Sequence, residues 1–173
     1  NGIDKTIATA MATANTVSTN SHLGINFNLV YSGLVDYIEQ GSGTDLGALR
    51  MKDDGLLDEV HEIRKNVGAD MVAFFTNTSG GVAYLINNRN GQPDTPFSIT
   101  GIASAKSLTF PHELSHNMGL GHYKYQKVQP GNTVWSNWEE NTWSGGWRWL
   151  SSDDNMYCDI MTYTSVEYHD DGM

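Results

Sequence analysis

Apolar positions in the first third of the chain recur with two periods, first that of a helix and then that of a strand. Residues 4–19 carry apolar side chains at helical spacing, which predicts an amphipathic helix. The stripe consists of Ile3, Ile7, Met11, Ala14 and Val17. Residues 25–31 then alternate between apolar and polar side chains, which predicts a half-buried strand.

A second helix and three more strands are expected before residue 104. Asp53 or Asp54 can cap this helix, and Gly68 can end it. Its stripe consists of Leu56, Val60, Ile63 and Val67. The apolar run at 71–75 predicts a buried central strand, and 81–86 and 97–103 predict two others. This order of elements predicts an α/β (α+β) fold with a mixed sheet.

The regular pattern ends near residue 123, and an irregular segment continues to residue 159. All five tryptophans fall in it, at Trp135, Trp138, Trp143, Trp147 and Trp149. Two interpretations stay open: the rings form the small core of a C-terminal lobe, or some of them line a substrate cleft. We expect one domain over residues 1–173, divided into subdomains 1–122 and 123–173.

Composition and charge narrow the possible partners. The chain has 20 acidic and 10 basic residues and a formal net charge of −10, which argues against a nucleic-acid or anionic-membrane partner. No apolar run approaches membrane-spanning length. Cys158 is the single cysteine, so an internal disulfide is impossible, and both a reducing compartment and a secreted bacterial protein fit. The first residue is not methionine, so we expect that a leader and a pro-segment have been removed.

Residues 112–122, with the sequence HELSHNMGLGH, contain the residues that carry chemistry. His112 and His116 are four apart and project from one face of a helix, where two imidazoles can bind one Zn²⁺. Glu113 lies beside the first ligand, and its carboxylate can reach a metal-activated water as general base. At Gly119 the helix can stop and reverse, because glycine tolerates positive φ, and His122 then becomes the third ligand. A buried helix with ordinary core histidines is the other interpretation, but this spacing makes coincidence improbable.

The downstream segment CDIMTY, residues 158–163, completes a pattern that resembles the metzincin metalloendopeptidases. The resemblance implies that Met161 belongs to a tight Met-turn beneath the zinc. Within some branches a tyrosine two residues later approaches the metal or the tetrahedral intermediate, and Tyr163 matches it. The arrangement of segments before the zinc motif is similar to the reprolysin-like bacterial branch and to the bacterial peptidyl-Asp metallopeptidases.

This resemblance implies a metzincin-like zincin fold and a substrate site. The fold is a twisted mixed sheet with two long helices, the zinc helix and a smaller irregular C-terminal lobe. The expected substrate edge strand consists of Gly81, Val82, Ala83 and Tyr84, to which a peptide adds antiparallel. One catalytic zinc is implied; calcium at Asp153 and Asp154 stays possible, but no motif supports it and a solvated turn is the preferred interpretation. The peptidyl-Asp branch implies a preference for an acidic residue after the scissile bond, for which closeness in sequence alone suggests Arg89, Lys106, Lys124 or Lys127 as the basic partner.

Three residues or segments depart from the family pattern. Ser115 replaces a common glycine, and a helix tolerates this change. Pro111 precedes His112, so the zinc helix must begin late, near Ser107, or be kinked. Residues 164–173 leave little room for a C-terminal helix.

The function expected from these residues is a secreted bacterial zinc endopeptidase, monomeric, that acts on protein or peptide substrates. The alternative is a non-catalytic zinc protein whose cleft binds a peptide or partner. Glu113 argues against that alternative, because a binding protein needs no base beside an open metal position.

Overall fold

The computed structural model describes residues 2–88, 90–127, 144–170 and 172 of the chain. Its helices are α1 (Gly2–Asn20), α2 (Ser42–Arg50), α3 (Glu59–Val67) and α4 (Thr109–Asn117). Its strands are β1 (Val72–Thr76), β2 (Gly81–Ala83), β3 (Phe97–Gly101), β4 (Arg148–Leu150) and β5 (Met156–Cys158). Helices and strands intermix along the chain, which confirms the expected α/β class.

The three strands of the first sheet lie in the order β1-β3-β2. β1 runs parallel to β3, with Val72 opposite Phe97, and β2 runs antiparallel to β3, with Val82 opposite Ile99. The sheet is therefore mixed, as the sequence predicts. In this sheet β3 is central and β1 and β2 are the outer strands, so the expected central position of residues 71–75 is wrong.

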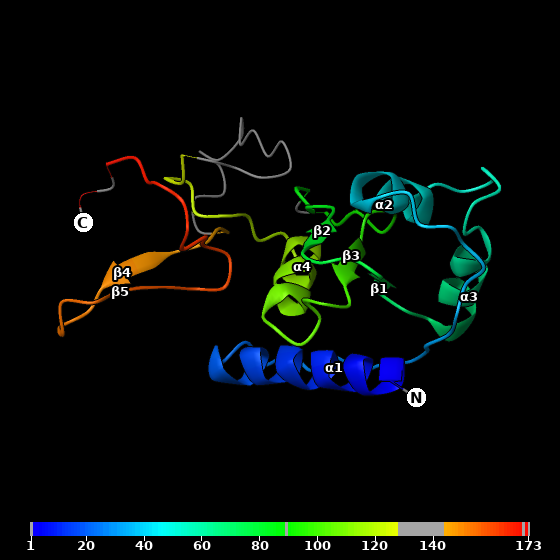
Figure 1. Cartoon of the computed structure of the whole chain (residues 1–173), viewed down its shortest axis with the longest axis horizontal. Coiled ribbons are helices and arrows are strands. Elements are labelled where there is room, and N and C mark those ends of the chain that lie inside the picture. Colours follow the sequence, from blue (N-terminus) through cyan, green and yellow to red (C-terminus); the bar gives the residue numbers. More distant parts are fainter. Residues whose placement is uncertain (1, 89, 128–143, 171, 173) are drawn as a thin grey trace.

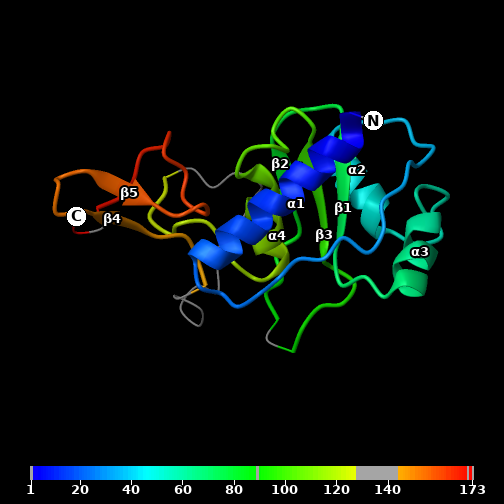
Figure 2. The same ribbon diagram turned by 90° about the horizontal axis from the view of Figure 1, so that it is seen from below.

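Helices cover both faces of the sheet (Figures 1 and 2). Because side chains alternate along a strand, Phe74 and Phe97 face α2 and α3, whereas Phe75 faces α1 and α4. The core on the α2 and α3 face consists of Leu46, Ala48, Leu49, Leu57, Phe97 and Ile99. The core on the other face consists of Ala10, Ala14, Phe110 and Leu114, and it fixes α4 against α1. Each large apolar side chain buried here contributes roughly 1.5–3 kcal/mol.

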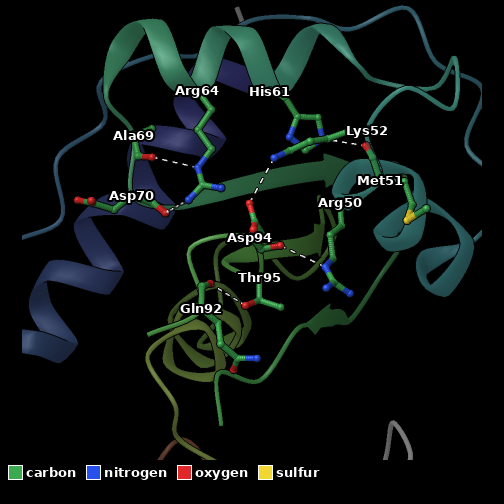
Figure 3. Close-up of polar contacts among 10 residues, drawn as sticks. All are labelled: Arg50, Met51, Lys52, His61, Arg64, Ala69, Asp70, Gln92, Asp94 and Thr95. Atoms are coloured by element: carbon green, nitrogen blue, oxygen red, sulfur yellow. Dashed lines mark hydrogen bonds and ion pairs between the residues drawn. The ribbon is translucent and has the colours of Figure 1, made fainter. Parts of the chain in front are cut away.

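Polar contacts tie α2 and α3 to the loops that lead into the strands (Figure 3). The Arg50 side chain donates to the carbonyl of Asp94 at 3.1 Å, and Lys52 pairs with the Asp94 carboxylate at 3.3 Å. From α3, Arg64 donates to the carbonyls of Ala69 and Asp70 at 3.1 and 2.7 Å. These cations are therefore engaged on the face of the sheet that α4 does not cover.

The expected strand at residues 25–31 is wrong, because this segment has no regular secondary structure. Its alternating pattern fits a strand, but a strand exists only where its backbone pairs with a neighbour. Instead, the Asn15 side chain of α1 donates to the carbonyl of Phe27 and accepts from its N–H, at 3.0 and 2.7 Å. The N–H and carbonyl of Phe27 are therefore hydrogen-bonded to a side chain instead of a neighbouring strand, and most of residues 25–31 are exposed.

The predicted helices exist, with different faces and ends. In α1 the buried positions are the small residues Thr6, Ala10, Ala14 and Ser18. Of the predicted apolar stripe, Ala14 is buried and Met11 packs against the core half-buried. In the second helix the expected cap is wrong: α3 begins only after Asp58, because Asp53 and Leu57 have positive φ. The helix ends as predicted at Gly68, which has φ 67° and lies in the left-handed region.

Two elements have no counterpart in the sequence prediction. Helix α2 lies in a glycine-rich stretch without an apolar stripe, and its Asp45 is fully buried. The carboxylate of Asp45 accepts hydrogen bonds from Tyr37, Gln40 and Gly41, so a polar residue anchors this helix. The β4–β5 hairpin is the other element, and it pairs Trp149 with Tyr157.

Of the five tryptophans, Trp135, Trp138 and Trp143 lie outside the described residues. Trp147 and Trp149 are 57% and 43% exposed, so these two do not form a core of the C-terminal lobe. Within the described residues, none of the helices combines the length and apolar character that a bilayer crossing requires.

Candidate metal centre

Helix α4 carries the first part of the candidate site and is buried along nearly its whole length. The helix begins at Thr109, so Pro111 falls in its first turn, where the missing N–H would have no helical partner. The sequence left open a late start of this helix or a kink at Pro111, and the structure has the late start. Ser115 donates its hydroxyl to the carbonyl of Pro111 at 2.8 Å, so this departure from the family pattern fits the helix.

Three histidine side chains converge at the C-terminal side of α4: His112, His116 and His122, here called the histidine trio. The Nε2 atoms of His112 and His116 are 3.1 Å apart, and the Nε2 atom of His122 lies 3.2 and 3.1 Å from them. All three residues are at most 9% exposed. The three ring nitrogens therefore form a nearly equilateral triangle in the interior.

The hydrogen bonds at the opposite ring nitrogens determine the tautomers of two histidines. His112 Nδ1 lies 2.6 Å from the carbonyl oxygen of Ile160, and His116 Nδ1 lies 2.7 Å from that of Leu120. A carbonyl oxygen only accepts, so both Nδ1 atoms carry the proton and both Nε2 atoms present a lone pair. Two lone pairs facing each other at 3.1 Å repel, and a cation between them removes that repulsion.

The triangle fits zinc in size and chemistry. Two nitrogen ligands of a tetrahedral zinc, at bond lengths of about 2.1 Å, lie about 3.4 Å apart. The distances in the trio are within a few tenths of an ångström of this value. Burial lowers the pKa of His112 and lowers that of His116 to about 3, so both rings are neutral at pH 7, as metal ligands must be.

The turn after α4 brings His122 back to the helix. Gly119 has φ 93°, in the left-handed region that glycine favours. Its N–H donates to the carbonyl of His116 at 2.9 Å, and the N–H of Leu120 donates to that of Ser115 at 2.9 Å. A Cβ at Gly119 would lie 3.1 Å from the carbonyl oxygen of Ile86, so space as well as φ favours glycine.

The segment at residues 158–163, here called the Met-turn, packs against the trio. Met161 is 1% exposed. The carbonyl oxygen of Ile160, the residue before it, accepts the hydrogen bond from His112 Nδ1. The Asp159 carboxylate accepts from the N–H groups of Trp147 and Met161 and from the Thr162 hydroxyl, at 2.9 to 3.0 Å. Asp159 therefore holds the Met-turn to the strand that begins at Arg148.

The Glu113 carboxyl is buried beside the trio. It is 4% exposed, and this burial raises its pKa to about 8, because the charged form has lost its water. The backbone of edge strand β2 packs directly on it: a Cβ at Gly81 would lie 2.5 Å from Glu113 Oε1. The space that a side chain at Gly81 would fill is thus occupied by the candidate general base.

Tyr163 packs against two histidines of the trio. Its ring centroid is 4.9 Å from that of His122 and 5.9 Å from that of His112, both edge to face. Burial and the charge of Glu113 raise the pKa of the Tyr163 hydroxyl, so it is a proton donor at neutral pH. Its backbone is held by Gln126, which accepts from its N–H at 2.7 Å.

The expected substrate strand is only partly an edge element. Gly81, Val82 and Ala83 form β2, whereas Tyr84 lies just beyond it. The side chains of Val82 and Tyr84 pack into the core on the α2 and α3 face, so the positions of β2 that face the other side are Gly81 and Ala83. Asn117 of α4 donates to the carbonyl of Tyr84 at 2.8 Å and fixes the end of the strand to the helix.

Sequence reasoning missed the residues that support the site, namely Asp159, Gln126 and Asn117. Each of the three makes at least one contact with a residue 12 to 37 positions away. Asp159 lies inside the motif that the sequence singles out, and an aspartate within a tight turn is a general signal for capped backbone N–H groups. The partners of Gln126 and Asn117 have no such local signal.

Comparison with known proteins places the chain among bacterial metallopeptidases. The profile of the reprolysin-like M12B metallopeptidases matches residues 5–123. A peptidyl-Asp metalloendopeptidase of Pseudomonas aeruginosa is 25% identical over 142 residues, which cover 73% of this chain and 23% of the relative. Proteins of the same name from Stenotrophomonas maltophilia and Xanthomonas campestris are 31% and 30% identical, over 65% of this chain and 27% of each relative. The chain thus spans about a quarter of the length of these relatives. No solved structure gave a significant match.

Proposed function

The chain belongs to the reprolysin-like M12B metallopeptidase family, and from this premise we propose that it is a zinc-dependent endopeptidase. The observation that supports this most directly is the histidine trio with Glu113 buried beside it. His112, His116 and His122 are the proposed ligands. Three protein ligands leave one tetrahedral position open, which is typical of a catalytic rather than a structural zinc.

A zinc ion held by the trio would act as a Lewis acid, which would lower the pKa of a water molecule and polarise the scissile carbonyl. In the proposed mechanism Glu113 accepts the proton of the attacking water at its carboxylate and passes it to the leaving amine.

Tyr163 and β2 are the proposed groups that orient the substrate. The Tyr163 ring packs against His112 and His122, from where its hydroxyl can donate a hydrogen bond to the oxyanion. Among the described residues, no strand pairs with the outer edge of β2, and an extended peptide can add there antiparallel. Gly81 then joins substrate binding to the base, since the same residue pairs in the sheet and contacts Glu113.

We further propose a preference for an acidic residue after the scissile bond. The support comes from the three relatives, each of which is named a peptidyl-Asp metalloendopeptidase. Secretion by a bacterium and a single catalytic domain over residues 1–173 belong to the same proposal.

The decisive experiment is the Glu113→Gln variant, assayed on a denatured protein substrate with and without a chelator. The amide has nearly the same shape but accepts no proton, so hydrolysis should fall by at least about 100-fold while zinc stays close to one per chain. Wild-type hydrolysis should stop on chelation and return when zinc is added.

A matched control is Glu62→Gln in α3, which makes the same chemical change on the far face of the sheet and should leave turnover unchanged. Near-normal turnover by the Glu113→Gln variant would show that Glu113 is not the general base. A wild-type chain that binds zinc and peptides but hydrolyses nothing would instead favour the non-catalytic alternative.

A further inference from the structure

We propose that Asp159 is a positioning residue for the proposed zinc ligand His112, on which it acts through one peptide group of the Met-turn. This inference rests on the proposed zinc site, and neither the sequence nor the named relatives indicate it. A histidine that binds a metal with one ring nitrogen usually donates a hydrogen bond with the other, which fixes the ring and makes the ligand more basic. For His112 the acceptor is the carbonyl oxygen of Ile160, 2.6 Å from Nδ1.

A single amide connects the Asp159 carboxylate to the His112 ring. Its carbonyl, which belongs to Ile160, accepts from His112 Nδ1. Its N–H, which belongs to Met161, donates to Asp159 Oδ1 at 3.0 Å. The order of groups is therefore carboxylate, amide and imidazole, and His112 Nε2 at the end of this series faces the other two histidines of the trio. An amide whose N–H is bonded to an anion is a better acceptor at its oxygen, because hydrogen bonds in series polarise one another.

The Asp159 carboxylate is held in place by the backbone on both sides. Its second oxygen, Oδ2, accepts from the N–H of Trp147 at 2.9 Å, and the Asp159 N–H donates to the Trp147 carbonyl at 3.0 Å. Both carboxylate oxygens thus accept from backbone N–H groups, which favours the charged form of the acid. The side chain is half-buried, so water and salt screen its charge less than that of an open surface carboxylate.

His116 provides a comparison within the same site. Its Nδ1 lies 2.7 Å from the carbonyl oxygen of Leu120, and the N–H of that amide belongs to Gly121. This N–H donates to the carbonyl of Ser144 at 2.8 Å, so the amide behind His116 is bonded to a neutral group. His112 and His116 therefore have the same kind of acceptor, and they differ in the charge of the group that stands behind it.

The alternative role for Asp159 is to stabilise the Met-turn without acting on His112. Thr162 allows the two roles to be separated, because its hydroxyl lies 3.0 Å from Asp159 Oδ1 and 3.1 Å from the Trp147 carbonyl oxygen. Removing this hydroxyl weakens the same turn but leaves the charge of Asp159 and its contact with Met161. Variants at positions 159 and 162 should therefore differ if the charge matters, and agree if only the turn matters.

The first test is proton NMR of the zinc-loaded protein in a Glu113→Gln background, which removes hydrolysis of the sample. Zinc is diamagnetic, and the buried Nδ1–H protons of His112 and His116 should give separate signals at low field. We expect the His112 signal at the lower field of the two, because the carbonyl that it contacts is the more polarised. Asp159→Asn should move the His112 signal to higher field and leave the His116 signal almost unchanged.

The second test is zinc affinity, measured by competition with a chelator. Asp159→Asn keeps the size of the side chain but removes its charge, and zinc should bind about 10- to 100-fold more weakly, as is usual when a partner of a metal ligand is removed. Thr162→Val should keep an affinity close to that of wild type. Asp153→Asn is the matched control, because it makes the same chemical change at an exposed carboxylate in the turn between β4 and β5 and should leave the affinity unchanged.

Equal losses of affinity in Asp159→Asn and Thr162→Val would overturn the inference, since a weaker turn would then explain both. Unchanged affinity in Asp159→Asn would also overturn it. The NMR comparison of His112 with His116 needs no change at position 159, so it decides the matter even if Asp159→Asn does not fold: a His112 signal at the same or higher field contradicts the inference. A wild-type chain that binds no zinc removes the proposed function together with the inference, whereas a chain that binds zinc but hydrolyses nothing contradicts the function alone.

Discussion

Replacing Gly81 with alanine should impair catalysis through the position of Glu113. The added Cβ would lie 2.5 Å from Glu113 Oε1, 2.7 Å from Cγ and 2.8 Å from Cδ. Ordinary van der Waals contact begins near 3.4 Å, so the carboxylate has to retreat by about 0.9 Å. Gly81 has no positive φ, and alanine therefore suits the backbone of β2.

The size of the effect follows from this displacement. A shift of about 1 Å in a catalytic group costs roughly 100-fold in rate. We therefore expect kcat to fall about 100-fold, which corresponds to about 2.7 kcal/mol in the barrier. KM should change by less than about threefold, because the β2 backbone that is proposed to bind the peptide keeps its pairing with β3.

Steady-state kinetics and zinc content together test this expectation. Zinc should remain close to one per chain, since Gly81 contacts the base and not the histidine trio. Gly47→Ala in α2 is the matched control, because nothing lies within 4 Å of its Cβ. This control should keep full activity and gain up to about 1 kcal/mol of stability from helix propensity.

A double-mutant cycle separates the steric effect from a general weakening of β2. In wild type, overpacking at Gly81 should cost about 1–3 kcal/mol of unfolding free energy in urea. In a Glu113→Ala background the colliding atoms are gone, and most of this cost should disappear. Equal costs in both backgrounds, or a normal kcat for Gly81→Ala, would refute the reasoning.

Two other predictions concern the turn and the buried acid. Gly119→Ala forces alanine to φ 93° and sets its Cβ 3.1 Å from the Ile86 carbonyl, at a cost of about 1–2 kcal/mol. Competition with a chelator should show about tenfold weaker zinc binding, and unchanged affinity would mean that His122 does not depend on this turn. In chelator-treated protein, burial raises the pKa of Glu113 from 4.5 to about 8, so the folded chain binds more protons than the unfolded chain in this range. The stability of the chelator-treated protein should therefore fall as the pH rises from 4.5 to 8. The Glu113→Gln variant should have a higher melting temperature than wild type at pH 8 and the same melting temperature at pH 4. A constant difference in melting temperature across this pH range would contradict the prediction.

The sequence alone was sufficient where one short segment contains all the required information. HELSHNMGLGH names three histidines, a base and a glycine, and the helix period with one turn brings the histidines together. The same holds for the ends of elements, since the helix stop at Gly68 and the late start of α4 before Pro111 follow from local backbone chemistry.

Other features depended on which distant segments meet. Residues 25–31 have the pattern of a strand, but Asn15 takes the backbone groups of Phe27. The buried face of α1 consists of small residues because α4 packs closely on it, a choice that no periodicity within α1 reveals. In each case the local sequence pattern is compatible with more than one structure, and the distant segment that packs against it determines which one forms.

The same division applies to the site. Local spacing identifies the proposed ligands and base, because side chains four apart on a helix share a face. Only the tertiary structure brings the carbonyl of Ile160 to His112 Nδ1 and the backbone of Gly81 to Glu113. These contacts join residues 48 and 32 positions apart, and their energies depend on distances that only the packed chain determines.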